Sequence, residues 1–113
     1  MKTVWDLLQG QARIGWTCDV ELAHHGDVDL NRILEAKGCD FTLANRKPRC
    51  PAPNCPGRVT FTDRSGSWPK PLDTIGDRDP AWWHYTERRR AELTALGWRM
   101  VMGKWVAPVE GPQ

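Results

Sequence analysis

The chain has 113 residues, of which 40% are hydrophobic and 27% charged, and its formal net charge is +2. This length predicts one small hydrophobic core with one appended element. No run of about 18 apolar residues occurs and no apolar signal region stands near the N-terminus, which argues against a transmembrane helix and a secreted protein. We therefore expect a cytoplasmic chain, in which four cysteines favour metal ligation over disulfides.

The basic residues are concentrated in the second part of the chain. Residues 1–42 carry four Lys and Arg against seven Asp and Glu, whereas residues 43–113 carry twelve against seven. This asymmetry favours an acidic partner such as nucleic acid. The seven tryptophans must supply much of the buried area, and because an indole keeps its N–H near water, some of them are expected at a contact surface.

Two short helices are predicted in the first forty residues. Thr3, with Asp6 three residues later, is an N-cap signature for a helix over residues 4–9. Asp29 caps a second helix over residues 30–37, whose Leu and Ile side chains lie on one face.

The extended segments are placed around these helices. Residues 12–18 are expected to form a strand that ends at a cysteine, and residues 19–29 a polar loop. Residues 41–49 are a second extended candidate, with residues 45–48 as its turn. Residues 59–62 alternate apolar side chains with threonine, which fits a half-buried strand.

The C-terminal third has a different composition. Residues 63–79 are rich in Ser, Gly, Pro and Asp, so we expect a linker or an extended arm that packs Trp68 and Leu72. Asp79 and Pro80 begin a helix that runs to about Leu96, followed by a strand over residues 98–106. The stripe of this helix comprises Trp82, Tyr85, Thr86, Arg89, Leu93 and Leu96.

The segment C-P-A-P-N-C-P-G over residues 50–57 carries the strongest chemical signal. Two thiols separated by four residues suit a zinc knuckle, because a tight turn must bring both sulfurs to about 2.3 Å from one tetrahedral ion. Proline makes the turn rigid, and Gly57 is expected to take a positive φ at its exit. We interpret Cys50 and Cys55 as half of a structural zinc site.

The other two ligands are less sharply defined. Cys18 ends a predicted strand, and His24 and His25 follow in a loop that can fold back on the thiolate. We favour Cys18, one of the two histidines (His24 first), Cys50 and Cys55. The alternative is an all-cysteine set with Cys39, which otherwise is a small buried hydrophobe.

The order of parts in the first 62 residues is Cys18, His24-His25, Val28-Asp29-Leu30, a helix, Arg49-Cys50 and Cys55-Pro56-Gly57-Arg58-Val59. This order resembles small zinc-ribbon-like proteins of uncharacterised function from alphaproteobacteria, which have a Cys pair, a Val-Asp-Leu helix start and an Arg-Cys-x-x-Cys-Gly knuckle. The second cysteine of the first pair is missing here, with Glu21 or Ala23 near its position, so we assign that place to histidine. The resemblance implies fold and metal but no activity.

Together these features predict an α+β fold centred on a zinc ribbon or zinc knuckle, with a short antiparallel sheet and two short helices. We expect residues 1–62 to form the zinc-ribbon-like domain and residues 63–79 the arm. Residues 80–107 are expected to form a helix-strand extension that packs on the same core.

Two enzymatic alternatives are weak. With only three cysteine ligands, a water molecule on zinc and Glu21 as base would give a hydrolase. Residues 88–101 resemble the closing helix and strand of very-short-patch-repair-type nucleases, but that fold needs an Asp and a Glu-x-Lys on adjacent strands. The one Glu-x-Lys of the chain, at residues 35–37, ends a predicted helix, so no catalytic residue and no small-molecule substrate are expected.

The function predicted is therefore non-catalytic binding. Basic side chains flank the knuckle and mark the C-terminal helix and strand, and with an exposed tryptophan they would suit nucleic acid. The expected surface comprises Arg46, Lys47, Arg49, Arg58, Trp83, Arg88, Arg89, Arg90 and Arg99. The alternative is a regulatory or phage-type adaptor that docks on a larger protein assembly, because Trp and Arg are also enriched at protein interfaces.

Overall fold

The structure is a computed structural model that describes residues 2–108. The chain divides into two compact units, an N-terminal unit, Met1–Thr74, and a C-terminal unit, Ile75–Gln113. Both contain helices and strands, so the fold is α+β. The elements are α1 (Val4–Gln9), β1 (Ile14–Cys18), β2 (His25–Asp27), α2 (Leu30–Lys37), β3 (Val59–Asp63), β4 (Lys70–Pro71), α3 (Pro80–Ala95), β5 (Arg99–Val101) and β6 (Lys104–Val106).

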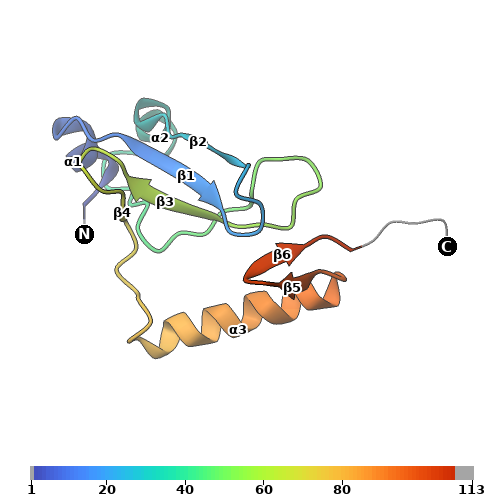
Figure 1. Ribbon diagram of the computed structural model, residues 1–113. Coiled ribbons are helices and arrows are strands. Elements are labelled where there is room, and N and C mark those ends of the chain that lie inside the picture. The colour runs from blue at the N-terminus through green and yellow to red at the C-terminus, as the bar shows by residue number, and fades with distance from the viewer. Residues whose placement is uncertain (1, 109–113) are drawn as a thin grey trace. The chain divides into compact units, whose positions relative to one another are not determined.

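The N-terminal unit is built on an antiparallel sheet with strand order β2-β1-β3-β4 (Figure 1). The register of the two central strands pairs Ile14 with Asp63 at one end and Cys18 with Val59 at the other. The end of β1 therefore lies beside the start of β3. Because the knuckle segment leads directly into β3, this register brings it to Cys18.

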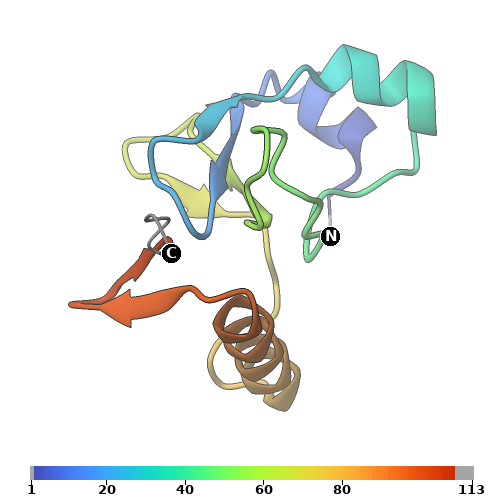
Figure 2. The ribbon, with the colours of Figure 1, turned by 90° about the vertical axis from the view of Figure 1, so that its right-hand side faces the viewer.

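One face of the sheet is covered by α1 and α2, which lie side by side (Figure 2). In β3 the side chains of Val59 and Phe61 are buried and those of the intervening threonines are half-buried, as the alternation predicted. The core of this unit comprises Val4, Leu7, Ile14, Leu30, Leu43, Val59 and Phe61.

Both predicted helix starts are confirmed. The Thr3 hydroxyl accepts a hydrogen bond from the Asp6 amide at 3.2 Å, and the Asp6 carboxylate accepts one from the Thr3 amide at 3.0 Å, which completes a capping box. Hydrogen bonding of the Asp6 carboxylate to the backbone amide of Thr3, and then to its side chain, holds the pKa of Asp6 below its ordinary value of 3.8. At α2, the Asp29 carboxylate accepts from the Arg32 amide at 3.2 Å.

Two predictions for extended segments are wrong. Residues 19–29, expected to be a loop, contain β2, whose three residues are too few to show a period. Residues 41–49 form no strand in the described structure, only the isolated bridges of Thr42 with Thr3 and of Arg49 with Arg58. A turn was expected at residues 45–48, and the chain does turn at Asn45, which takes φ 62°, with the Arg46 amide donating to the Leu43 carbonyl at 3.2 Å.

The arm over residues 63–79 is partly ordered by pairing with the sheet. Its strand β4 pairs with β3, and Leu72 packs against the core as predicted. Trp68, by contrast, is 79% exposed, so the prediction that the arm packs this indole is wrong. The tryptophan lies in the Ser/Gly-rich part of the arm, which precedes β4 and contributes no side chain to the core.

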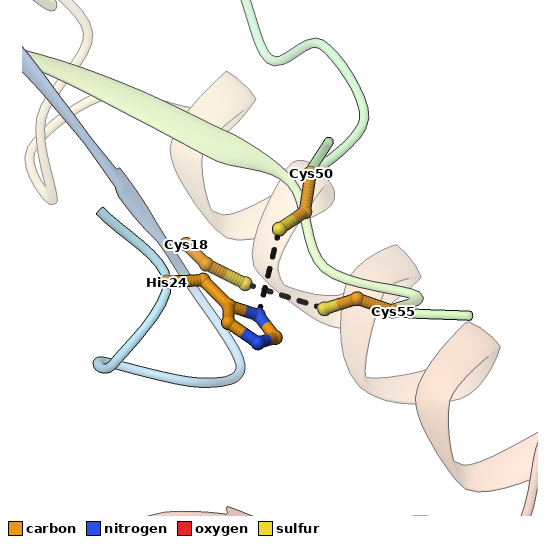
Figure 3. A group of neighbouring side chains, drawn as sticks. All are labelled: Cys18, His24, Cys50 and Cys55. Carbon is orange, nitrogen blue, oxygen red and sulfur yellow. Dashed lines mark hydrogen bonds between the residues drawn. The ribbon is translucent and has the colours of Figure 1, made fainter. Parts of the chain in front are cut away.

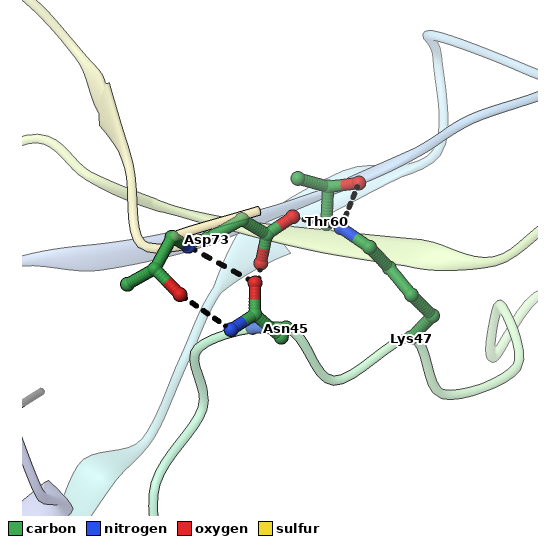
Figure 4. A network of polar contacts seen from close by, with 5 residues as sticks. Asn45, Lys47, Thr60 and Asp73 are labelled. Atoms are coloured by element: carbon green, nitrogen blue, oxygen red, sulfur yellow. Dashed lines mark hydrogen bonds and ion pairs between the residues drawn. The ribbon is translucent and has the colours of Figure 1, made fainter. Parts of the chain in front are cut away.

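A polar network fastens the end of the arm to the turn at Asn45 (Figure 4). The Asn45 amide donates to the Asp73 carboxylate at 2.8 Å, and Asn45 exchanges two further hydrogen bonds with Thr74, at 2.7 and 3.0 Å. Lys47 forms an ion pair with Asp73 and donates to the Thr60 hydroxyl of β3 at 3.4 Å. The arm, the turn and β3 are thus joined.

In the C-terminal unit, α3 begins where Asp79 and Pro80 predicted. The Asp79 carboxylate accepts from the Ala81 amide at 2.9 Å, and the helix ends before Gly97, whose φ is +93°. Of the predicted stripe, Arg89 and Leu93 are buried, whereas Leu96, the C-cap, is 59% exposed.

The predicted strand over residues 98–106 is a hairpin. Strands β5 and β6 pair with each other around Met102 and Gly103, which have φ of 51° and 80°. This turn was missed because Met-Gly is not a typical turn pair. That this unit packs on the N-terminal core stays a prediction.

Candidate metal centre

The first two candidate ligands come from the β1–β2 hairpin (Figure 3). Cys18 ends β1 with only 1% of its surface exposed, and its sulfur accepts the amides of Val20 and Glu21, each at 3.4 Å. The Cys18 amide donates to the His24 carbonyl at 2.9 Å, which closes the loop. This hydrogen bond brings the His24 imidazole close to the Cys18 sulfur, at the start of the loop.

The other two candidates come from the knuckle before β3. The Cys50 amide donates to the Gly57 carbonyl at 3.0 Å, and the Cys55 amide to the Ala52 carbonyl at 3.3 Å, so the segment is closed by its own backbone. The expected positive φ at Gly57 is wrong, because Asn54 takes the left-handed conformation instead, at φ 59°. Asparagine tolerates this region better than most residues.

Gly57 is required for another reason, which is space. A Cβ built on this residue would lie 2.2 Å from the Cys18 sulfur and 3.3 Å from the Cys55 sulfur. The first distance is far inside van der Waals contact, so no larger side chain fits without moving a sulfur. The backbone at Gly57 thus sets how closely the hairpin and the knuckle approach.

Asp19 holds the two loops together. Its carboxylate accepts a hydrogen bond from the Arg58 amide at 2.8 Å, and its own amide donates to the Arg58 carbonyl at 2.9 Å. These two bonds extend the pairing of β1 and β3 past Cys18 by one residue. No sequence pattern identified this role of Asp19, since an aspartate after a cysteine is not a recognised signal.

The four side chains converge on one point (Figure 3). The candidate ligand atoms of Cys18, His24, Cys50 and Cys55 all lie within 4.8 Å of one another. The two sulfurs of Cys18 and Cys55 are 3.7 Å apart, and the Cys50 sulfur is 3.6 Å from His24 Nδ1. A zinc tetrahedron has edges of about 3.8 Å between sulfurs and about 3.6 Å from sulfur to nitrogen. The Cys/His cluster could therefore hold a metal ion.

The electrostatics of the cluster favour a cation. Burial raises the pKa of the Cys55 thiol to about 12, the Gly57 amide opposes that rise, and the neighbouring thiols of Cys18 and Cys50 add to it. Without a positive charge nearby, then, the Cys55 thiol stays protonated. A bound divalent ion reverses this order, because a coordinated thiol loses its proton.

The two alternative ligands lie outside the cluster. His25 is exposed on β2, where it pairs with Thr17. Because side chains alternate along a strand, it points to the opposite side from His24. Cys39 is also exposed and not a buried hydrophobe, and its sulfur lies 3.9 Å from the Asp40 carboxylate. Neither joins the group formed by the other four residues.

The basic residues near the knuckle are largely used within the fold. Arg46 lies over the Phe41 ring, 4.1 Å from its centroid, and donates to the Thr42 carbonyl. Lys47 belongs to the Asp73 network, and half-buried Arg58 donates to the Lys47 carbonyl at 3.4 Å. Arg49 is exposed. The sequence could not show the use of Lys47, because its partners Thr60 and Asp73 are distant in the chain.

The C-terminal basic residues divide differently. Arg89 is 8% exposed and pairs with Glu92 at 2.9 Å, so it is not the surface residue that was expected. Arg88, Arg90 and Arg99 are exposed, and none has an ion-pair partner among residues 2–108. Trp83 is 55% exposed. That these residues converge with those around the knuckle stays a prediction.

Comparison of the chain with protein-family models, with curated proteins and with solved structures found no match. Within the described part of the chain, no helix is long and apolar enough to cross a membrane. The features of the chain that bear on function are the Cys/His cluster and the exposed cationic and aromatic residues.

Proposed function

We propose that the protein is a non-catalytic binding module whose N-terminal unit is held by one structural zinc ion. The single observation that carries this proposal is the arrangement of Cys18, His24, Cys50 and Cys55, whose ligand atoms lie within 4.8 Å of one another, with the Cys18–Cys55 and Cys50–His24 distances close to the edges of a zinc tetrahedron. Four protein ligands complete the coordination of zinc and leave no position for a reacting water. This favours a structural role over a hydrolase.

The donor set supports zinc over other common ions. Three thiolates and one imidazole suit a borderline-soft ion that accepts tetrahedral geometry, whereas calcium and magnesium take oxygen ligands. The ion would also join the hairpin and the knuckle in a unit with a core of seven buried residues. We further propose membership of the zinc-ribbon-like proteins named above, with His24 replacing the missing cysteine.

Substitution of the ligands tests the metal site against matched controls. We expect about one zinc per chain by mass spectrometry of the purified protein. Cys18→Ser, Cys50→Ser, Cys55→Ser and His24→Ala should each lower this content. Cys39→Ser and His25→Ala should not, and His24→Cys should retain it. Wild-type protein prepared without chelator and found free of zinc would contradict the proposal.

The partner we propose is nucleic acid, contacted through the C-terminal unit. Residues 88–106 contain five Arg and Lys against one Glu, and Arg88, Arg90 and Arg99 are exposed without ion pairs among the described residues. Exposed guanidinium groups of this kind neutralise phosphates and release counterions. The contact is thus assigned to the basic helix and hairpin, not to the zinc ion.

The salt dependence of binding tests this assignment. Arg88→Ala with Arg90→Ala should weaken binding to every sequence and lower the slope of log affinity against log salt by about one per lost phosphate contact. Arg32→Ala, an exposed arginine on α2, is the matched control and should change neither. An unchanged slope in the double variant would place the contact elsewhere.

A protein partner is the second candidate, and the β5–β6 hairpin favours it. Met100, Val101 and Val106 are each more than a third exposed, and Met102 is 97% exposed. Methionines on such a surface can adapt to a partner. Binding to a larger assembly that is independent of salt, and that is lost in Met100→Ser with Met102→Ser, would support the adaptor over the nucleic-acid module.

A further inference from the structure

Trp83 on α3 is exposed and yet held in a defined position. Its indole N–H donates to the Asp77 carbonyl at 2.7 Å, and its ring meets that of Trp82 edge to face, with centroids 4.9 Å apart. More than half of its surface nevertheless remains open to solvent. The side chain thus loses little freedom when a ligand covers it, which favours binding.

Exposure alone would not distinguish this tryptophan. Trp68 is more exposed, at 79%, but has no ring contact and no hydrogen bond among the described residues. The indole N–H of Trp83 is already satisfied within the chain. What Trp83 offers to a partner is therefore ring surface, which stacks on any base without regard to sequence.

Cationic groups lie within reach of this ring along α3. Arg90 follows Trp83 by seven residues, which places it on the same face roughly 10 Å further along the helix. Arg90 is exposed, as is Arg88. Glu87 lies between the ring and Arg90 on this face, and its carboxylate opposes an anionic ligand.

We propose that this face of α3 binds single-stranded nucleic acid, with Trp83 stacking on a base and Arg90 contacting a phosphate. The inference rests on the nucleic-acid function proposed above and specifies its substrate. A single strand is favoured because stacking on a protein ring requires an unstacked base, which an intact duplex does not present.

Binding of a labelled twelve-nucleotide oligothymidylate, followed by fluorescence anisotropy, tests the proposal. Trp83→Ala should weaken binding at least about fivefold, whereas Trp83→Phe should retain most of the affinity. Trp68→Ala is the matched control and should have no effect. Glu87→Gln should tighten binding, since it removes a negative charge beside the phosphate.

A strand of the same length without bases separates stacking from charge. On this abasic strand, wild-type protein should bind more weakly and Trp83→Ala should cause no additional loss. If Trp83→Ala lowered the affinity equally for both strands, or did not lower it for oligothymidylate, the stacking role would be overturned while nucleic-acid binding stands. Wild-type protein that binds neither single strand nor duplex would overturn both proposals. Equal helix content and zinc content in all variants control for folding.

Discussion

At the scale of single residues, Gly57 has the least room for change. The Cβ added by Gly57→Ala would lie 2.2 Å from the Cys18 sulfur, so a ligand has to move. We expect a loss of about 1–3 kcal/mol in stability, as for other overpacked sites, together with weaker zinc binding in a chelator competition. Gly66→Ala is the control, because nothing lies within 4 Å of its Cβ. Equal zinc affinity in the two variants would contradict the close approach.

The capping box at α1 gives a second prediction at this scale. Thr3→Ala removes one of its two hydrogen bonds and should cost about 1 kcal/mol in unfolding free energy. Because the pKa of Asp6 is lowered, the carboxylate's contribution is complete above its ordinary pKa and is lost as the pH falls through the lower folded value. Denaturant unfolding should therefore show the same decrease in unfolding free energy for Thr3→Ala throughout the neutral pH range.

At the scale of elements, β4 depends on the polar network at its end. Asp73→Ala removes the acceptor for the Asn45 amide and the ion pair of Lys47. We expect β4 to detach from β3, so that the Leu72 amide, which donates to the Phe61 carbonyl at 3.1 Å, exchanges its hydrogen faster.

Hydrogen exchange measured by mass spectrometry checks this prediction. Asp40→Ala is the control, since Asp40 is exposed and outside the network. The Cys/His cluster should keep its zinc in both variants, because none of its ligands belongs to the network. Unchanged protection of Leu72 in Asp73→Ala would show that strand pairing alone retains the arm.

Which elements were predictable depended on whether their signals are local. The helix starts at Thr3, Asp29 and Asp79 are capped by residues adjacent in the chain, and all three are confirmed. Strand β2 and the hairpin of β5 and β6 have three residues per strand, which is too short for a period. These short strands form only by pairing with a partner strand, and the propensities of their own residues do not predict that pairing.

At the scale of the whole molecule, zinc is expected to decide whether the N-terminal unit folds. Structural zinc contributes about 10–16 kcal/mol of apparent binding free energy, which is comparable with the whole stability of a small domain, about 5–15 kcal/mol. A strong chelator should abolish hydrogen-exchange protection in β1 and β3. Protection that survives in metal-free protein, checked by mass spectrometry, would show that the core suffices alone.

Only half of the candidate site could be predicted without ambiguity from the sequence. The spacing of Cys50 and Cys55 indicated a knuckle, but the choice between His24 and His25 depended on the short strand that turns His25 away. The basic surface was less predictable, because the sequence does not distinguish a lysine or arginine that is exposed to solvent from one that pairs with a distant aspartate. Lys47 is engaged in this way by Asp73. Arg89 pairs with Glu92 only three residues along α3, but its burial could not be inferred from that spacing.

The two loops of the Cys/His cluster also imply an order of assembly. Each loop supplies two ligands close in the chain, whereas His24 and Cys50 are 26 residues apart. An ion can thus be captured by one loop before the sheet exists, and the second loop arrives when the intervening chain closes. The entropy of that closure grows only with the logarithm of its length, by about 0.6 kcal/mol per doubling. Evolution could therefore lengthen or replace the segment that carries α2 at little cost to metal capture.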